Sequence, residues 1–166
     1  MPTYIAFLRA VNVGGRFVKM ADLREALVQA GFGDVQTHIQ SGNVFVRSAR
    51  RTSGPVAVEI SRVLTAHCGF DVPAIVRTPA EVRSVLRAVD AVEPLLEGES
   101  KRYGAFADAE VPLEAAALLD SWDQPDERVR VLGSEVLAEM TIGFHRTTLT
   151  NTRPERLTGR TTTWRD

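Results

Sequence analysis

Cysteine is almost absent from this sequence, and its absence limits the chemistry that the chain can carry. Cys68 is the only cysteine in 166 residues. A single thiol can form neither an internal disulfide nor a cysteine-rich zinc site. A chain without disulfides suits a reducing compartment, so the sequence predicts a cytoplasmic protein.

Long hydrophobic runs are missing as well. No apolar run approaches the roughly 18 residues that a membrane-spanning helix needs. The first five residues contain no basic segment of the kind that begins a signal peptide. We therefore expect no membrane partner. Hydrophobic residues make up 44% and charged residues 25% of the chain, which is the balance of a globular protein.

The common signatures of catalysis and metal binding are also absent. The three histidines, His38, His67 and His145, lack the spacing of metal ligands, so we expect neither a metal nor another cofactor. His67 and Cys68 are neighbours on a predicted helix and point about 100° apart, so they cannot act as a base and a nucleophile. No Gly-x-Ser-x-Gly motif is present. The sequence therefore assigns no catalytic residue.

Lysine is scarce, and the basic residues are unevenly distributed. Lys19 and Lys101 are the only lysines among 20 basic residues. Genomic codon bias explains this preference for arginine, and selection for bidentate contacts with anions is the alternative. The net charge is −1, which argues against nucleic acid as a partner. Residues 1–77 nevertheless carry nine basic and five acidic side chains, residues 78–140 carry six and fourteen, and residues 141–166 carry five and two.

Apolar patterning in the first 77 residues predicts four strands and two helices. The order is strand 3–11, helix 20–30, strand 35–40, strand 44–46, a helix from 56 to about 69, and strand 72–77. This βαββαβ order predicts a ferredoxin-like subdomain. The residues expected to be buried are Phe7, Leu23, Leu27, Val44, Val46, Ile60 and Leu64. Strand alternation leaves open whether Val44 and Val46 or Phe45 face the helices.

Residues 78–166 predict a second, smaller α+β subdomain, so that the whole chain is of the α+β class. Thr78, Pro79 and Glu81 form a capping box that opens a helix. A polar loop over 93–102 is followed by strand 103–109, helix 113–119 and strands 128–132 and 135–140. After Met140 the apolar pattern fails. Residues 141–166 are therefore expected to form a polar, basic tail with one short strand at 161–164.

The loop between the first strand and the first helix is the leading candidate for a ligand site. A glycine-containing loop that leads into a helix lets backbone N–H groups approach an anion. Only two glycines are present and they are adjacent, so the loop is neither a P-loop nor a Rossmann fingerprint. A plain turn with solvated arginines is the alternative. The candidate ligand-binding residues are Arg9, Asn12, Gly14, Gly15, Arg16 and Lys19.

Two further segments are expected to join this loop. The first strand runs antiparallel to the third, so the loop should meet the turn that carries Ser41 and Asn43. The basic tail would add guanidinium and amide donors from Arg146 and Asn151, with Arg146 within about 10 Å of the glycines. A turn that satisfies only its own backbone and a solvated basic tail are the alternatives.

Several of these segments resemble the DUF1697 family. The resemblance is carried by residues 4–15, 18–23, 40–44, 69–73 and 149–151, in matching order and spacing over essentially the whole chain. It implies two α+β subdomains, of which the first is ferredoxin-like. It implies no reaction, because the family is named for its unknown function.

The sequence departs from the family pattern near its end. Thr148 stands where the family usually has a lysine, and Thr162-Thr163 stand where an Arg-Asn pair precedes the tryptophan. The family also has a helix after the position of Trp164. If the missing basic residues serve a ligand, this member is expected to bind it weakly or differently. Without the helix that follows the tryptophan in the family, an apolar groove is expected to be exposed.

Three functions are compatible with these features. Binding of a small anionic or phosphorylated ligand, with or without catalysis, is favoured by the candidate loop. An RNA-binding module is an alternative, because residues 42–46 partly match an RNA-recognition motif, although Asn43 and Ser48 stand where aromatic residues would stack. A protein-interaction module is the third, and an oligomer is compatible with it.

Overall fold

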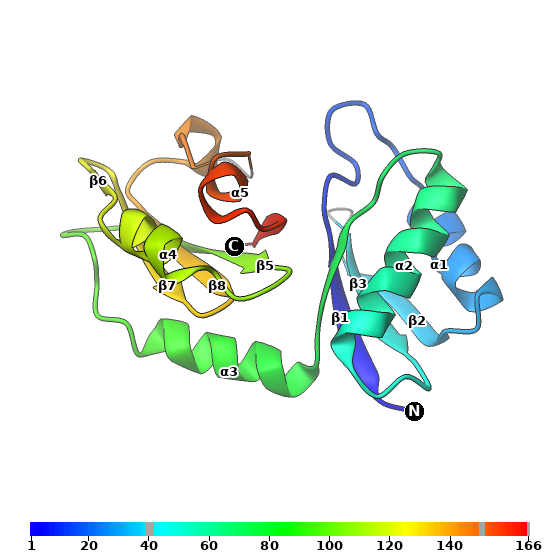
Figure 1. The fold of residues 1–166 in the computed structure, drawn as a ribbon. Helices are drawn as coiled ribbons and strands as arrows, with labels where there is room; N and C mark the ends of the chain where they lie inside the picture. Colours follow the sequence, from blue (N-terminus) through cyan, green and yellow to red (C-terminus); the bar gives the residue numbers. More distant parts are fainter. Residues whose placement is uncertain (39–41, 150–151, 166) are drawn as a thin grey trace. The chain divides into compact units, whose positions relative to one another are not determined.

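The computed structural model describes residues 1–38, 42–149 and 152–165. It divides the chain into two compact units, Met1–Val82 and Arg83–Asp166. The units are nearly equal in length, whereas the sequence predicts a smaller second subdomain. The fold is α+β in both units, with two antiparallel sheets (Figure 1).

The first unit has the βαββαβ order that the sequence predicts. Its elements are β1 (Thr3–Leu8), α1 (Met20–Gln29), β2 (Gly33–His38), β3 (Asn43–Arg47), α2 (Ser53–Cys68) and β4 (Ala74–Arg77). The strands pair antiparallel in the order β2-β3-β1-β4. Figure 1 shows α1 and α2 lying together on one side of this sheet.

Strand β1 ends three residues earlier than predicted. Ala10 and Asn12 adopt left-handed backbone conformations, with φ of 59° and 57°. Such conformations cannot continue a β-strand. Residues 9–19 therefore form a long loop between β1 and α1, which we call the β1–α1 loop.

The core of the first unit lies between the sheet and its two helices. It contains Val44 and Val46 of β3, Leu23 and Leu27 of α1, and Ile60 and Leu64 of α2. Phe7 is also buried, so all seven residues predicted for burial are buried. Phe45 is half-buried and alternates with Val44 and Val46, so it lies on the opposite face of the sheet.

The second unit holds a five-stranded sheet. Its elements follow α3 (Pro79–Asp90), which runs across the boundary between the units. They are β5 (Lys101–Ala107), α4 (Leu113–Asp120), β6 (Asp123–Gln124), β7 (Glu127–Leu132), β8 (Glu135–Met140), the 3-10 helix η1 (Phe144–Arg146), α5 (Thr152–Thr158) and β9 (Thr162–Arg165). The strand order is β6-β7-β8-β5-β9.

The predicted capping box of α3 is confirmed. The backbone N–H of Thr78 donates to Oε2 of Glu81 at 2.6 Å, and the N–H of Glu81 donates to Oγ1 of Thr78 at 3.2 Å. These reciprocal bonds satisfy backbone donors that the start of a helix leaves unpaired. The element therefore begins where local side-chain chemistry predicts it.

The prediction of a polar tail after Met140 is wrong. The segment contains η1, α5 and β9, and only its short strand was predicted. Strand β9 pairs with β5, with Trp164 opposite Ala105. Among the described residues of this segment, the buried ones are Thr147, Leu149, Pro154, Thr158, Thr162, Thr163 and Trp164. Threonine is β-branched and suits a strand, so a polar composition here conceals a part of the core.

Candidate functional site

Three segments of the first unit meet at the end of β1. The N–H of Leu8 donates to the carbonyl of Gly42 at 2.8 Å, and the N–H of Arg9 donates to the carbonyl of Pro73 at 3.0 Å. The end of β1 therefore lies between the β2–β3 turn and the segment that leads into β4. Figure 1 shows that segment beside the β1–α1 loop. This is the neighbourhood that the antiparallel pairing of β1 and β3 predicts.

Gly42 makes the close approach of the β2–β3 turn possible. Its φ is +88°, and a Cβ added to it would lie 2.9 Å from Cβ of Leu8. Both the backbone conformation and the lack of space therefore require glycine. Gly42 is therefore held close to the end of β1, with its carbonyl accepting the hydrogen bond from Leu8.

The β1–α1 loop closes on itself through a tight turn. The N–H of Arg16 donates to the carbonyl of Val13 at 3.1 Å, and the N–H of Asn12 donates to the carbonyl of Arg16 at 2.8 Å. Gly14 and Gly15 occupy the centre of the turn with φ of 58° and 83°. Positive φ at both central positions is the geometry of a type I′ turn. The turn thus explains both glycines without a ligand.

Asn12 holds the second half of the loop in place. Its Oδ1 accepts a hydrogen bond from the N–H of Val18 at 2.8 Å. Asparagine tolerates the left-handed region better than most residues. Asn12 therefore has a structural role in the loop, in addition to the ligand-binding role that the sequence predicts for it.

Ala10 is the strained position of the loop. Its φ of 59° lies in the left-handed region, where its Cβ is disfavoured by about 1–2 kcal/mol. Unlike Asn12, alanine has no polar side chain to offset the strain. Strained backbone of this kind persists only where the surroundings hold it, and it clusters at ligand sites.

Three cationic side chains belong to the loop. Arg9 is half-buried, whereas Arg16 and Lys19 are exposed. The guanidinium carbon of Arg16 lies 5.4 Å from the centre of the Phe70 ring, which orients the side chain by a cation–π contact. Residues 9–19 contain no acidic residue, Asp22 in the first turn of α1 is the nearest one in sequence, and Asp71 is next to Phe70, so the loop itself carries an excess of positive charge.

The other residues predicted for the site fall outside this loop. Asn43 lies opposite Phe7 in the sheet, at the same end of β1. Ser41 and Asn151 are not among the described residues. Arg146 lies in η1 of the second unit. Their convergence with the β1–α1 loop stays a prediction.

Two apolar residues of the loop were missed by the sequence reasoning. The side chain of Phe17 is 79% exposed and that of Val13 is 59% exposed. Their exposure could have been inferred from their position in a loop that contains glycines and basic residues, where no amphipathic helix or strand could bury them. Phe70 and Pro73 were also missed as neighbours of the loop, because only the fold brings them there.

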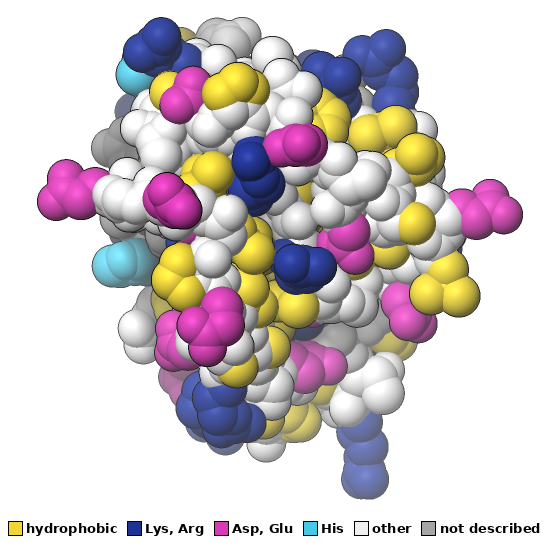
Figure 2. All heavy atoms as spheres, turned by 90° about the vertical axis from the view of Figure 1, so that its left-hand side faces the viewer, with side chains coloured by type: hydrophobic (Ala, Val, Ile, Leu, Met, Phe, Trp, Pro, Cys, Tyr) yellow, Lys and Arg dark blue, Asp and Glu magenta, His cyan; other side chains and the backbone are white. Residues whose placement is uncertain are grey.

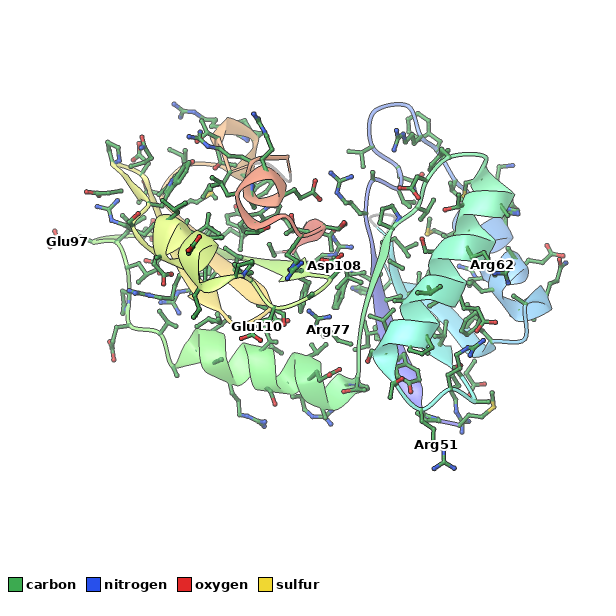
Figure 3. The ribbon with its side chains drawn as sticks, viewed as in Figure 1. Arg51, Arg62, Arg77, Glu97, Asp108 and Glu110 are labelled. Carbon is green, nitrogen blue, oxygen red and sulfur yellow. The ribbon has the colours of Figure 1, made fainter. Side chains whose placement is uncertain are left out.

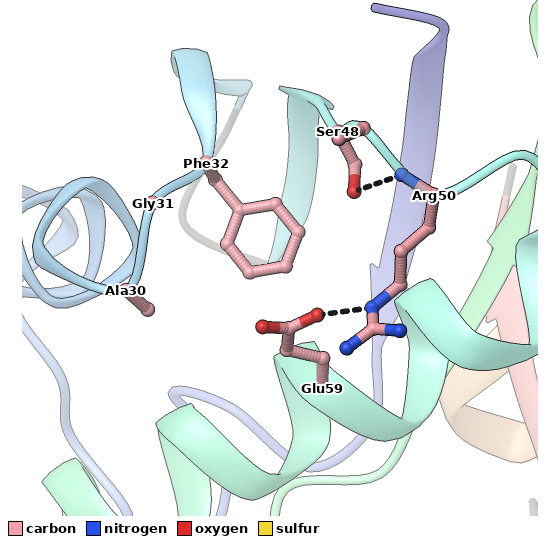
Figure 4. A pocket seen from close by; sticks show the side chains of 7 residues that line it. Ala30, Gly31, Phe32, Ser48, Arg50 and Glu59 are labelled. Carbon is pink, nitrogen blue, oxygen red and sulfur yellow. Dashed lines mark hydrogen bonds and ion pairs between the residues drawn. The ribbon is translucent and has the colours of Figure 1, made fainter.

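A hollow at the other end of the sheet offers a different kind of surface (Figure 4). It has a volume of about 370 Å³ and is lined by Ala30, Gly31, Phe32, Ser48, Ala49, Arg50 and Glu59. Nε of Arg50 lies 2.5 Å from Oε2 of Glu59, and the N–H of Arg50 donates to Oγ of Ser48 at 3.2 Å. The two opposite charges neutralise each other, so this hollow has no excess of positive charge.

A buried carboxylate in the second unit has a structural role. Glu139 is 1% exposed, and its Oε1 accepts hydrogen bonds from the N–H groups of Leu95 and Leu96 and from Oγ of Ser100, at 3.2, 3.0 and 2.9 Å. Its Oε2 pairs with Nε of Arg102 at 2.9 Å. Burial acts to raise the pKa of Glu139, but these hydrogen bonds outweigh it and the pKa is lowered. The group stays ionised and cannot serve as a general acid near neutral pH.

Cys68 is not an activated nucleophile. Burial raises the pKa of its thiol, so the thiol stays protonated at neutral pH. Among the described residues, no three His, Cys, Asp or Glu side chains gather closely enough to hold a metal ion. Nor does any described helix combine the length and apolarity needed to cross a membrane.

The fold and the site define an α+β protein of two units, with a constrained basic loop at one end of its first sheet. The chain belongs to the DUF1697 family, described as a protein of unknown function, whose model matches residues 1–137. The structure is similar to that of the conserved bacterial protein SP0830 from Streptococcus pneumoniae, with a TM-score of 0.67 and 22% sequence identity. The similarity covers 98% of this chain and 91% of that chain, and it shows the fold alone. No curated protein matches the chain.

Proposed function

We propose that the first unit binds a small anionic or phosphorylated ligand at the β1–α1 loop. The observation that carries this proposal is the placement of Arg9, Arg16 and Lys19 on a loop whose backbone is fixed by its own hydrogen bonds. A fixed loop loses little conformational entropy when a ligand binds. The left-handed backbone of Ala10 adds support, because strained backbone clusters at ligand sites.

The chemistry of the loop favours a phosphate over a simple halide. A guanidinium offers planar, paired donors that match two oxygens of a phosphate, and an ammonium adds a point charge. Arg16 is oriented by Phe70, so its donors need little reorganisation. The described residues at this end of the sheet include no activated nucleophile, and we therefore propose binding and assign no reaction.

Isothermal titration with inorganic pyrophosphate tests this function. We expect Arg16→Gln and Lys19→Gln each to weaken binding by about tenfold, because a charge-assisted hydrogen bond contributes about 1.5–3 kcal/mol. Affinity should also fall as salt concentration rises. Arg51→Gln and Arg62→Gln are the matched controls. Arg51 extends away from the first unit and Arg62 lies on α2, and neither belongs to the loop (Figure 3).

The controls make the outcome specific. They remove the same charge from the same unit, so they should leave the affinity for pyrophosphate within about twofold of the unsubstituted protein. Equal losses in all four variants would show only a general charge effect. Absence of any binding to the unsubstituted protein would overturn the proposed function.

The face that Figure 2 shows is the left-hand side of Figure 1, where the second unit lies. On this face Lys and Arg side chains are mixed with Asp and Glu among apolar groups, so it carries no broad surface of one charge sign. Binding of an extended polyanion relies on a broad surface of one charge sign. A small ligand needs only the few cations that one loop provides.

We further propose a ferredoxin-like classification for the first unit and a cytoplasmic location for the protein. The strand order β2-β3-β1-β4, with both helices on one face, supports the classification. The single cysteine supports the location, since the protein holds together without an internal disulfide. Fractionation of cells that produce the protein would test the location directly.

A further inference from the structure

Phe17 is a large aromatic side chain held in water. It is 79% exposed, which is more than any other aromatic residue among the described large hydrophobic ones. A ring left in water forgoes the stabilisation that burial would give it. The ring therefore leaves an apolar face open to stacking by a ligand.

The backbone on both sides of Phe17 is fixed. Arg16, which precedes it, is bonded through its N–H to Val13 and through its carbonyl to Asn12. Val18, which follows it, donates its N–H to the side chain of Asn12. The position of Phe17 is therefore set before a ligand arrives, and only its side-chain torsions remain to be fixed.

Cationic groups stand on both sides of this aromatic residue. Arg16 directly precedes Phe17, and Lys19 follows two residues later, at the position before α1 begins. Val13, across the tight turn, adds a second exposed apolar side chain. The loop thus carries an exposed aromatic ring within two residues of two exposed cationic side chains.

We propose that the anionic ligand of this loop is a nucleotide, whose base stacks on Phe17 and whose phosphate is held by Arg16 and Lys19. This inference rests on the proposed function and adds the substrate class. Every base has a π-face, so stacking on an aromatic residue favours nucleotides over phosphorylated ligands without a ring. A membrane surface is less favoured, because one exposed aromatic ring and one valine give little apolar area for stable insertion.

The test compares ligands that differ only in the base. Adenosine 5′-monophosphate and ribose 5-phosphate share the phosphate and the sugar, and pyrophosphate has neither sugar nor base. By isothermal titration we expect the adenosine compound to bind the unsubstituted protein at least about fivefold more tightly than ribose 5-phosphate. Phe17→Ala should abolish this preference and leave the affinity for pyrophosphate unchanged.

Two further variants complete the experiment. Phe17→Trp should retain the base preference, and stacking should quench the fluorescence of the new tryptophan. Val58→Ala, at a position that is 70% exposed on α2, is the control for loss of an exposed apolar side chain and should change nothing. Because Phe17 is exposed, its variants are expected to fold, and thermal melts followed by circular dichroism check this.

The outcomes separate this inference from the proposed function. If the protein binds pyrophosphate but does not prefer the adenosine compound to ribose 5-phosphate, the proposed anion site is supported and the proposal of a nucleotide ligand is overturned. A preference that persists in Phe17→Ala also overturns it. Phe17-dependent binding to vesicles of anionic phospholipid, without binding to the adenosine compound, overturns it in favour of a membrane. Much tighter binding of a short oligoadenylate than of the mononucleotide overturns the small-nucleotide site in favour of a single strand.

Discussion

Gly42 and Gly31 have nearly the same backbone conformation but different surroundings. Their φ angles are +88° and +93°, yet a Cβ at Gly42 would lie 2.9 Å from Leu8 while nothing lies within 4 Å of one at Gly31. We expect Gly31→Ala to lower the free energy of unfolding by about 1–2 kcal/mol, from left-handed strain alone. Gly42→Ala should lower it by roughly 1–3 kcal/mol more, because of the added steric clash.

Urea denaturation followed by circular dichroism measures both effects. The difference between the two variants isolates the steric clash with Leu8, because both substitutions have the same cost in left-handed backbone strain. Equal losses in the two variants would show that the β2–β3 turn can move away from β1. In that case the meeting of segments at the end of β1 would be less rigid than the hydrogen bond from Leu8 to Gly42 indicates.

Single residues differ in how much of their role the sequence predicts. The burial of Leu23 and Leu27 follows from helical spacing, and the tight turn follows from Gly14-Gly15. The left-handed conformation of Ala10 could not be predicted, because alanine has no preference for it. The candidate loop was found from its glycines and cations, whereas the exposure of Phe17 depends on how the loop folds back on itself.

At the scale of elements, Glu139 and Arg102 hold the connection between α3 and β5. Glu139 binds the backbone of Leu95 and Leu96, and Arg102 donates to the carbonyls of Val89 and Val92 at 2.8 Å each. A segment without regular structure is thus fixed at both ends by one ion pair. Buried hydrogen bonds of this kind are costly to leave unpaired.

Glu139→Gln is expected to destabilise the protein at pH 7 by at least about 1–3 kcal/mol, because it removes a buried charge that accepts four hydrogen bonds. The folded pKa lies below the ordinary value of 4.5, so the ionised carboxylate favours the folded state. Its contribution is present above that value and is lost as the pH falls through the folded pKa. The difference between the two proteins should therefore shrink on acidification toward pH 3.

Hydrogen exchange and urea denaturation at several pH values measure this effect. Exchange at the amides of Leu95 and Leu96 should accelerate in the variant. Glu97→Gln is the control, since Glu97 extends outward from the same connection (Figure 3). A constant difference between the Glu139 variant and the unsubstituted protein across the pH range would contradict the assigned role.

Elements with local signals were predicted well, whereas burial that depends on pairing between distant segments was not. Helix α3 begins at a capping box formed by residues three apart, so its start is readable from the sequence. Strand β9 and the burial of Thr162 depend on pairing with β5, which lies far away in the chain. Polar composition therefore concealed the role of the last segment.

At the scale of the whole molecule, each unit has its own hydrophobic core. The core of the first unit, from Tyr4 to Val76, is formed entirely by residues within Met1–Val82. A fragment of residues 1–82 is therefore expected to fold by itself and to unfold cooperatively in urea. A fragment of residues 1–72, which lacks β4, is the control and should not fold stably. A broad, non-cooperative transition in the longer fragment would contradict this prediction.

Strand β5 is an interior strand of the second sheet, and this position has a consequence for synthesis of the protein. Its neighbours are β8 and β9, and Trp164 of β9 pairs with Ala105 of β5. Translation proceeds at about 5–20 residues per second, so the ribosome needs several seconds to extend the chain from β5 to β9. Until β9 emerges, one side of β5 presents unpaired N–H and C=O groups, which can recruit a strand from another nascent chain. The first sheet passes through a similar interval, because β1 gains its second neighbour only when β4 emerges, so each sheet carries a risk of aggregation during synthesis until its last strand is made.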